Sequence, residues 1–160
     1  MMRVLLFISL LFISACGFKP LYEAGGSSVA MQAKLSAIDV GPIPDRLGQI
    51  MRNRLLDRLN VSATQQYHLD IMLTQSTEGY GVRPDGGTTQ EQLTIVAAVK
   101  LVALEDDTVL FEEEMRARTA YDLVLSDFAT VTQREDSARR LVLELAERIH
   151  RRLAFQFANS

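Results

Sequence analysis

Few side chains in this sequence have the chemistry of a reactive site. The 160-residue chain contains one cysteine, Cys16, and two histidines, His68 and His150. A thiolate is a strong nucleophile near neutral pH, and a histidine can act as a base or as a metal ligand. Neither histidine has a partner at the spacing that zinc sites use. We therefore predict no metal, no cofactor and two structural histidines, which leaves Cys16 as the residue whose setting indicates chemistry.

The segment before Cys16 indicates what that chemistry is. Arg3 is followed by a mostly apolar run, residues 4–13, which is far shorter than the ~20 residues of a transmembrane helix. Such a run is typical of an export signal. Small residues at Ser14 and Ala15 suit a protease cleft, and the pattern resembles a bacterial lipobox. We predict that residues 1–15 are a lipoprotein signal peptide and that Cys16 receives a diacylglycerol and acyl chains such as palmitate. An ordinary signal peptide beside a chance cysteine is the alternative.

The composition limits the classes of protein that remain. The chain has 17 Lys and Arg against 20 Asp and Glu, a formal net charge of −3. This mildly acidic balance argues against a nucleic-acid binder, which would normally present a basic face. A single cysteine also excludes an intramolecular disulfide. Glycines and serines at residues 25–28 predict that residues 16–33 form a lipidated flexible tether, followed by one α+β domain over residues 34–160.

Hydrophobic periodicity predicts the elements of that domain. A short apolar run indicates a first strand over residues 34–40. The strand period indicates further strands over residues 65–75, 92–104 and 109–121, whereas spacings of three and four indicate helices over 46–59 and 127–153. Asp45 is placed to cap the first helix, and Asn60 can end it in the left-handed conformation. The strand–helix–strand unit predicts two parallel strands. We expect an α+β two-layer sandwich in the order β-α-β-β-β-α, with two helices on one face of a mixed four-stranded sheet.

A glycine-rich segment separates the second and third predicted strands. Residues 76–88 contain four glycines and a proline, which predicts an exposed loop. The segment lacks the Gly-Lys-Ser/Thr ending of a phosphate-binding loop. We predict that Tyr80 and Arg83 anchor this loop at the surface of a partner. A plain hairpin turn is compatible with the same composition.

Charged residues alternate along the last predicted strand. Glu112 and Glu114 share a face with Arg116 and Arg118. The arginines can pair with these carboxylates, or they can offer guanidinium forks to phosphate groups. General acid–base catalysis needs carboxylates across a cleft rather than neighbours on one strand. With no nucleophile, base and orienting group in view, we predict that the protein is not an enzyme.

The sequence directly after the predicted cleavage point carries a family resemblance. Cys16-Gly17-Phe18-Lys19-Pro20-Leu21-Tyr22 resembles the opening of the LptE family of lipopolysaccharide-assembly lipoproteins. A weaker similarity continues through residues 118–122 and the final arginine-rich helix. The resemblance implies an outer-membrane lipoprotein on the periplasmic side that plugs the LptD β-barrel and takes part in lipopolysaccharide transport. It also implies contacts to lipopolysaccharide through basic residues, for which Arg118 is the best positional match; Arg116 is chosen by charge and exposure.

Two other functions remain open at this stage. An auxiliary lipoprotein of an ABC-type lipid-transport system would also be small, tethered and α+β. An envelope hydrolase would require a nucleophile and a base brought together by the fold. The run Phe18–Tyr22 favours the LptE-like function over both.

Overall fold

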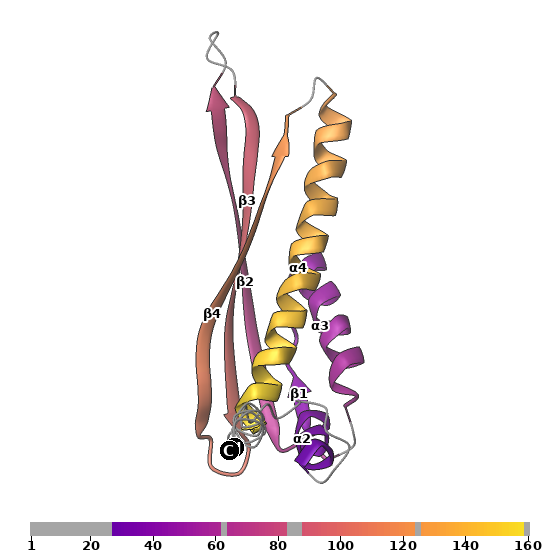
Figure 1. Ribbon diagram of the computed structural model, residues 1–160, viewed down its shortest axis with the longest axis vertical. Coiled ribbons are helices and arrows are strands. Elements are labelled where there is room, and N and C mark those ends of the chain that lie inside the picture. The colour runs from indigo at the N-terminus through magenta and orange to yellow at the C-terminus, as the bar shows by residue number, and fades with distance from the viewer. Residues whose placement is uncertain (1–26, 62–63, 83–87, 124–125, 159–160) are drawn as a thin grey trace, which may run out of the picture. The chain divides into compact units, whose positions relative to one another are not determined.

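The computed structural model describes residues 27–61, 64–82, 88–123 and 126–158. The chain divides into two compact units, residues 1–30 and 31–160, and the second unit carries the fold. The elements in chain order are α2 (Ser27–Ser36), β1 (Ile38–Val40), α3 (Asp45–Leu59), β2 (Tyr67–Val82), β3 (Thr88–Ala103), β4 (Val109–Asp122) and α4 (Asp127–Ala158) (Figure 1).

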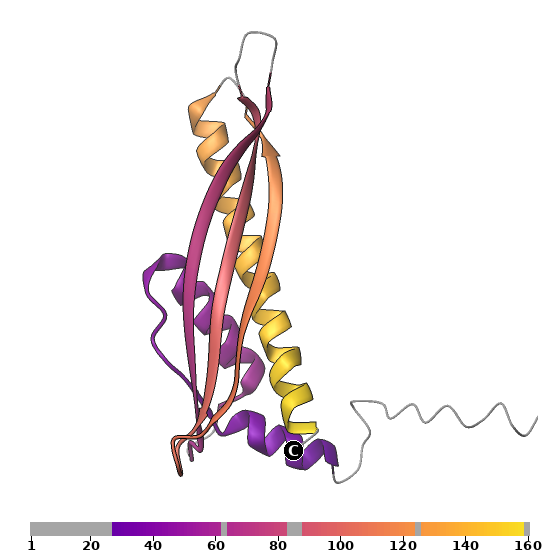
Figure 2. The ribbon, with the colours of Figure 1, turned by 90° about the vertical axis from the view of Figure 1, so that its left-hand side faces the viewer.

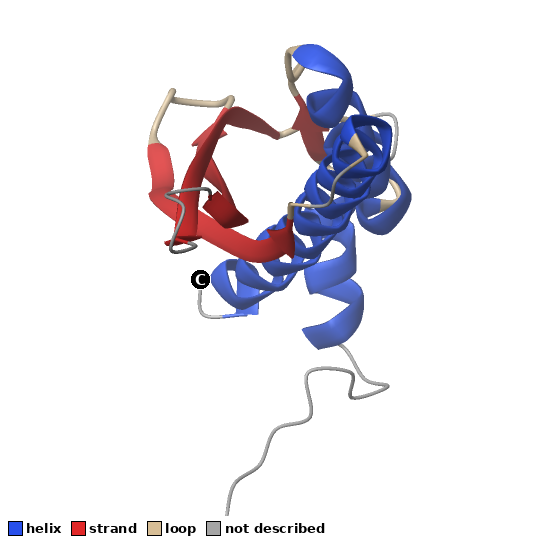
Figure 3. Cartoon of the chain, turned by 90° about the horizontal axis from the view of Figure 1, so that it is seen from above, coloured by secondary structure: helices blue, strands red, loops and turns tan. Residues whose placement is uncertain are grey.

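The four strands form one mixed sheet in the order β1-β2-β3-β4. β1 pairs with β2 in parallel, and the other two pairs are antiparallel. The helices lie on one side of the sheet when the chain is viewed from above (Figure 3). The predicted α+β sandwich, with a mixed four-stranded sheet and helices on one face, is therefore confirmed.

The predicted apolar stripes form the core between the two layers. Alternate residues of β3 from Leu93 to Leu101 are buried, as strand periodicity requires. The buried stripe of α4 is the predicted one: Ala138, Leu141, Val142, Leu145, Ile149 and Leu153. The helix also continues past the predicted end, because Phe157 is buried and packs on Tyr67 with ring centroids 4.8 Å apart.

Helix α2 was not predicted. It includes residues 27–33, expected as the end of a flexible tether, and it shortens the strand expected over residues 34–40 to Ile38–Val40. Met31 and Leu35 explain the difference, since they are one helical turn apart and both are buried in the core. The preceding glycines and serines obscured this pair in the sequence.

The two ends of α3 test the capping predictions. Asn60 is left-handed, with φ 52° and ψ 53°, and its N–H donates to the carbonyl of Leu56, as predicted. The prediction for Asp45 is wrong: Pro44 holds the N-cap position, no side chain caps the helix, and Asp45 itself has φ 65°. A Cβ at Gly48 would lie 2.6 Å from the carbonyl oxygen of Ile43, so the connection before the helix packs directly on its first turn.

A carboxylate joins the two long helices. Glu147 of α4 accepts hydrogen bonds from Arg54 and Arg58 of α3, with Nη2 of Arg54 2.6 Å and Nε of Arg58 2.9 Å from its Oε1. Glu147 also lies four residues before Arg151 on α4, which is the spacing of a favourable ion pair within one helix. Glu144 and Arg148 have the same spacing and do pair, at 2.5 Å. Tertiary packing thus directs Glu147 to α3 instead of to Arg151.

The predicted glycine-rich loop is largely strand. β2 continues through Tyr80 to Val82, and Gly79 and Tyr80 pair in regular register with Glu91 and Gln90 of β3. Only residues 83–87 of the predicted loop lie outside these strands, and they lie outside the described residues. Cross-strand pairing outweighs the low strand propensity of glycine here.

Candidate functional site on the open face of the sheet

Among the described residues, no helix lies on one face of the sheet. We call it the open face, and it consists of the even-numbered residues of β2, β3 and β4. On β4 most residues on the side of the helices are buried, including Phe111, Met115 and Tyr121, whereas the even-numbered residues from Glu112 to Arg118 on the open face are exposed. Figure 2 shows the three long strands side by side with α4 behind them.

The strand register places the two predicted arginines among small and hydroxylated residues. Arg116 lies opposite Val96, and Arg118 lies opposite Thr94. The next strand continues these two rows with Thr74 and Ser76. Because alternate residues of a strand are about 7 Å apart, the two guanidinium groups can reach one anionic group together.

Within the described residues, neither Arg116 nor Arg118 has an ion-pair partner. Their predicted partners Glu112 and Glu114 also form none there, while Glu113, on the opposite face of β4, pairs with Arg152 at 2.9 Å. The alternative in which the arginines neutralise their neighbours is therefore absent from this structure. Both guanidinium groups remain available for bidentate hydrogen bonds to phosphate or carboxylate oxygens.

Toward the Tyr67 end of β2, the open face carries charges of both signs and an exposed apolar side chain. Asp70, Lys100 and Glu112 form one row across the three strands, and the next row contains the 69% exposed side chain of Met72. These residues, with Pro42, border a hollow of about 460 Å³. Charge of both signs beside exposed apolar surface is characteristic of a contact surface for a macromolecule.

The predicted partner-binding residue Tyr80 also lies on this face. It lies near the end of β2, is 42% exposed, and forms a row with Gln90 and Asp122. Its predicted position in a loop is wrong, but the alternation of β2 brings it to the side that carries Arg116 and Arg118. Arg83 and Cys16 lie outside the described residues.

On the helix-facing side of the sheet, opposite the open face, Glu91, Tyr121 and Arg134 form a hydrogen-bonded triad. The hydroxyl of Tyr121 donates to Oε2 of Glu91 and accepts from Nε of Arg134 at 2.7 Å. Arg134 also donates to the same Glu91 oxygen at 2.8 Å. The hydrogen bond from Tyr121, reinforced by Arg134, lowers the pKa of Glu91, while burial raises the pKa of Tyr121. The triad fixes β3, β4 and α4 together.

Sequence reasoning missed this triad. Its members lie up to 43 residues apart in the chain. The only available signal was the strand period, which puts Glu91 and Tyr121 on the same helix-facing side as the core residues.

The histidines have separate structural surroundings. Nδ1 of His68 lies 3.0 Å from Asp39 and Nε2 lies 3.3 Å from Asp70, so both nitrogens face carboxylates. Burial in α4 lowers the pKa of His150. Across the described part of the chain, no group of three His, Cys, Asp or Glu side chains is arranged to hold a metal ion.

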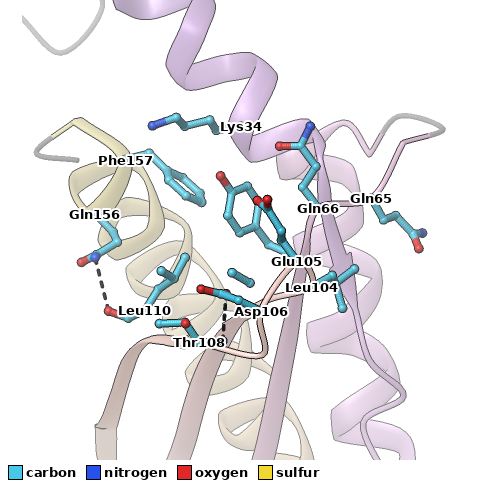
Figure 4. A pocket seen from close by; sticks show the side chains of 12 residues that line it. Lys34, Gln65, Gln66, Leu104, Glu105, Asp106, Thr108, Leu110, Gln156 and Phe157 are labelled. Carbon is cyan, nitrogen blue, oxygen red and sulfur yellow. Dashed lines mark hydrogen bonds between the residues drawn. The ribbon is translucent and has the colours of Figure 1, made fainter.

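A second hollow lies where α2, the start of β2 and the end of α4 meet. It measures about 540 Å³, and Lys34, Leu104 and Phe157 are among its lining residues (Figure 4). The ammonium of Lys34 is 5.7 Å from the ring centroid of Phe157, and Gln156 donates to the carbonyl of Leu110. Lys34 and Phe157 thus form a cation–π contact with each other, and the hollow lies at this end of the core.

Comparison with known proteins decides the family. The family model described as LptE, lipopolysaccharide-assembly, matches residues 34–153, more than half of the chain. The chain belongs to the LptE family. An LptE-family assignment agrees with the resemblance seen after Cys16, although the matched region begins beyond it. An uncharacterized protein of Rickettsia prowazekii (strain Madrid E) is 28% identical over 145 residues, which cover 91% of this chain and 90% of that protein.

Solved structures share the LptE-like fold at low sequence identity. A candidate lipoprotein from Caulobacter crescentus CB15 has a TM-score of 0.65 and 21% identity, covering 84% of this chain and 100% of its own. The rare lipoprotein B of Shewanella oneidensis has a TM-score of 0.62 and 15% identity, covering 77% and 96%. A minor lipoprotein of Acinetobacter baumannii has a TM-score of 0.59 and 14% identity, covering 75% and 93%.

None of the described helices combines the length and the apolar composition that crossing a bilayer requires.

Proposed function

We propose that this LptE-family protein is the plug and assembly partner of an LptD-like β-barrel in lipopolysaccharide transport to the outer leaflet. The observation that carries the proposal is the family match over residues 34–153. The open face, which no helix of the described residues covers, supports it, because such a domain presents a broad surface that a barrel wall can cover. The role needs no catalytic group, in keeping with the prediction that the protein is not an enzyme.

The proposal includes an anchor. Residues 1–15 would be removed, Cys16 would carry the lipid, and the domain would sit at the periplasmic side of the outer membrane. Two or more acyl chains hold a protein stably at a bilayer, since each buried methylene contributes about 0.8 kcal/mol. Gly17 follows the lipidated cysteine, where an aspartate would favour retention in the inner membrane of enteric bacteria.

The proposed lipopolysaccharide contact is the pair Arg118 and Arg116. The absence of ion-pair partners for both within the described residues supports this, since a phosphate would meet guanidinium groups that do not first have to break a salt bridge. Tyr80 and Arg83 are proposed to contact the barrel at the adjoining end of the sheet.

A membrane pull-down with the tethered, tagged full chain tests the proposal. We expect a barrel of LptD size to be recovered with the wild type. Recovery of an inner-membrane ATPase complex in its place would refute the proposed role. Cys16→Ser should abolish palmitate labelling and leave the precursor uncleaved.

The lipopolysaccharide contact has its own matched pair of variants. Arg118→Glu should reduce the lipopolysaccharide retained with the purified protein. Arg140→Glu reverses an exposed charge on α4 that pairs only with Asp136, at 3.3 Å, among the ion pairs of the described residues. Equal retention in both variants would remove Arg118 from the site.

A further inference from the structure

The second strand of the sheet has an edge that β1 covers only in part. β1 pairs with Tyr67, His68 and Leu69, and the connection after it continues to border the hollow beside Asp70 and Met72. Within the described residues, no strand pairs with this side of β2 from Leu73 onward. An unpaired edge exposes backbone donors and acceptors that another strand can bind.

The orientation of the free backbone groups follows from two hydrogen bonds. The carbonyl of Leu69 accepts from the N–H of Gly41, so the backbone groups of Leu69 point toward β1. The carbonyl of Gln66 accepts from Leu104, so even-numbered residues point toward β3. Because N–H and C=O groups alternate along a strand in regular register, Leu73, Gln75, Thr77 and Gly79 direct theirs to the free edge.

This edge lacks the usual protection against pairing. From Leu73 to Gly79 the edge contains no proline and a single charged residue, Glu78, and its pairing with β3 is regular. The opposite edge of the sheet, β4, carries five charged residues between Glu112 and Arg118. Charges, prolines and bulges are the common devices that keep edges from binding other strands, so the contrast distinguishes β2 from β4.

A groove lies beside the free edge on the helix side. It has a volume of about 350 Å³, and its walls are Gln75 of β2, Leu47 and Ile50 of α3, and Ala138 and Arg139 of α4. A strand added along β2 would direct alternate side chains to this side of the sheet. The groove would therefore receive one of them at the level of Gln75.

The charges at the rim limit which segment fits. Arg46, Arg139 and Glu135 border the groove and have no ion-pair partner within the described residues. The two other charged residues of the rim are already paired, Asp136 with Arg140 and Arg134 with Glu91. Because the unpaired arginines outnumber the unpaired carboxylate, an apolar side chain next to an acidic one fits the apolar walls and the remaining positive charge.

We propose that the β2 edge from Leu73 to Gly79 binds an extended segment of the barrel partner by strand addition, with an apolar side chain of that segment in the groove beside Gln75. This inference rests on the proposed function for the identity of the partner. Main-chain hydrogen bonds would supply affinity and the groove would supply specificity, as in other cases of strand addition.

Substitutions at one position of the free edge test the inference. Thr77→Pro removes an N–H that points away from β3 and places a ring in the path of an added strand. Thr77→Val keeps this N–H and the shape of the side chain, and it serves as the matched control. Full-length tethered variants are compared in the pull-down, with melting temperatures measured on each. Thr77→Lys is the second variant, since it obstructs the edge and leaves the backbone intact.

Thr77→Pro and Thr77→Lys should each weaken recovery of the barrel about tenfold, while Thr77→Val leaves it near wild type and all three melt close to the wild type. A photocrosslinker at Gln75 should attach to one extended segment of the barrel. Undiminished recovery with Thr77→Pro and Thr77→Lys, an equal loss with Thr77→Val, or crosslinks to a second copy of this chain would each overturn the inference and leave the proposed function standing. Failure of the wild type to recover any barrel would refute both.

Discussion

Removing one hydroxyl tests how the triad joins the two layers. Tyr121→Phe keeps the ring, which belongs to a residue only 4% exposed, and deletes the oxygen that bonds to Glu91 and Arg134. The direct bond from Arg134 to Glu91 remains, so the variant leaves no buried charge unpaired. The loss is therefore confined to two hydrogen bonds with charged partners.

The expected cost follows from those bonds. A hydrogen bond to a charged group contributes about 1.5–3 kcal/mol to stability. The side chains of Glu91 and Arg134 are 21% and 38% exposed, so water replaces part of what is lost. We expect the free energy of unfolding to fall by about 2 kcal/mol, measured by urea denaturation. Tyr67→Phe is the control, since the Tyr67 hydroxyl has no hydrogen bond within the described residues, and it should cost under about 0.5 kcal/mol.

The same variant changes the dependence of stability on pH. The Tyr121 hydroxyl lowers the pKa of Glu91, so the native carboxylate binds fewer protons than the unfolded one. This contribution is present above the ordinary glutamate pKa of about 4.3 and is lost as the pH falls through the lowered value. Tyr121→Phe should therefore lose less stability than the wild type on acidification. Equal costs for the two Phe variants, or identical acid profiles, would refute the assigned role of the triad.

Three further predictions concern the helix layer and its neighbours. Glu147→Gln should lower the free energy of unfolding by about 1 kcal/mol, because both α3 arginines lose their partner, while Glu144→Gln should cost about 0.3 kcal/mol; equal values from urea titrations would contradict the bridging role. His150 should titrate below about pH 6.5 by NMR, since burial lowers its pKa, and stability should fall as the pH drops below that value; titration above it would contradict this. Phe157→Ala should cost about 3 kcal/mol in thermal unfolding, and a loss under about 1 kcal/mol would show that the end of α4 is not part of the core.

The sequence was sufficient for those parts of the fold that local periodicity determines. The stripe of α4 from Ala138 to Leu153 and the alternation of β3 are buried as predicted, because helix and strand periods fix which residues share a face. The parallel pairing of β1 with β2 follows from the strand–helix–strand order. Position on the open face was equally predictable for Arg116 and Arg118.

What the sequence could not supply depends on contacts between distant segments. Glu147 pairs with α3 and not with Arg151, because the packing of the two helices places Arg54 and Arg58 beside it. β2 continued through Gly79 because β3 pairs with it residue by residue. Arg118 has no ion-pair partner within the described residues, because the residue opposite it on β3 is the uncharged Thr94. The strand register determines this pairing, and local composition does not.

The brevity of β1 has a consequence for how the protein is made. This strand has three residues, Ile38–Val40, so most of one side of β2 has no strand partner in the part of the chain that the structure describes. When synthesis of the chain outpaces that of its partner, surplus molecules should adhere edge to edge and precipitate. Balanced production of the two components would then be a requirement of the fold itself.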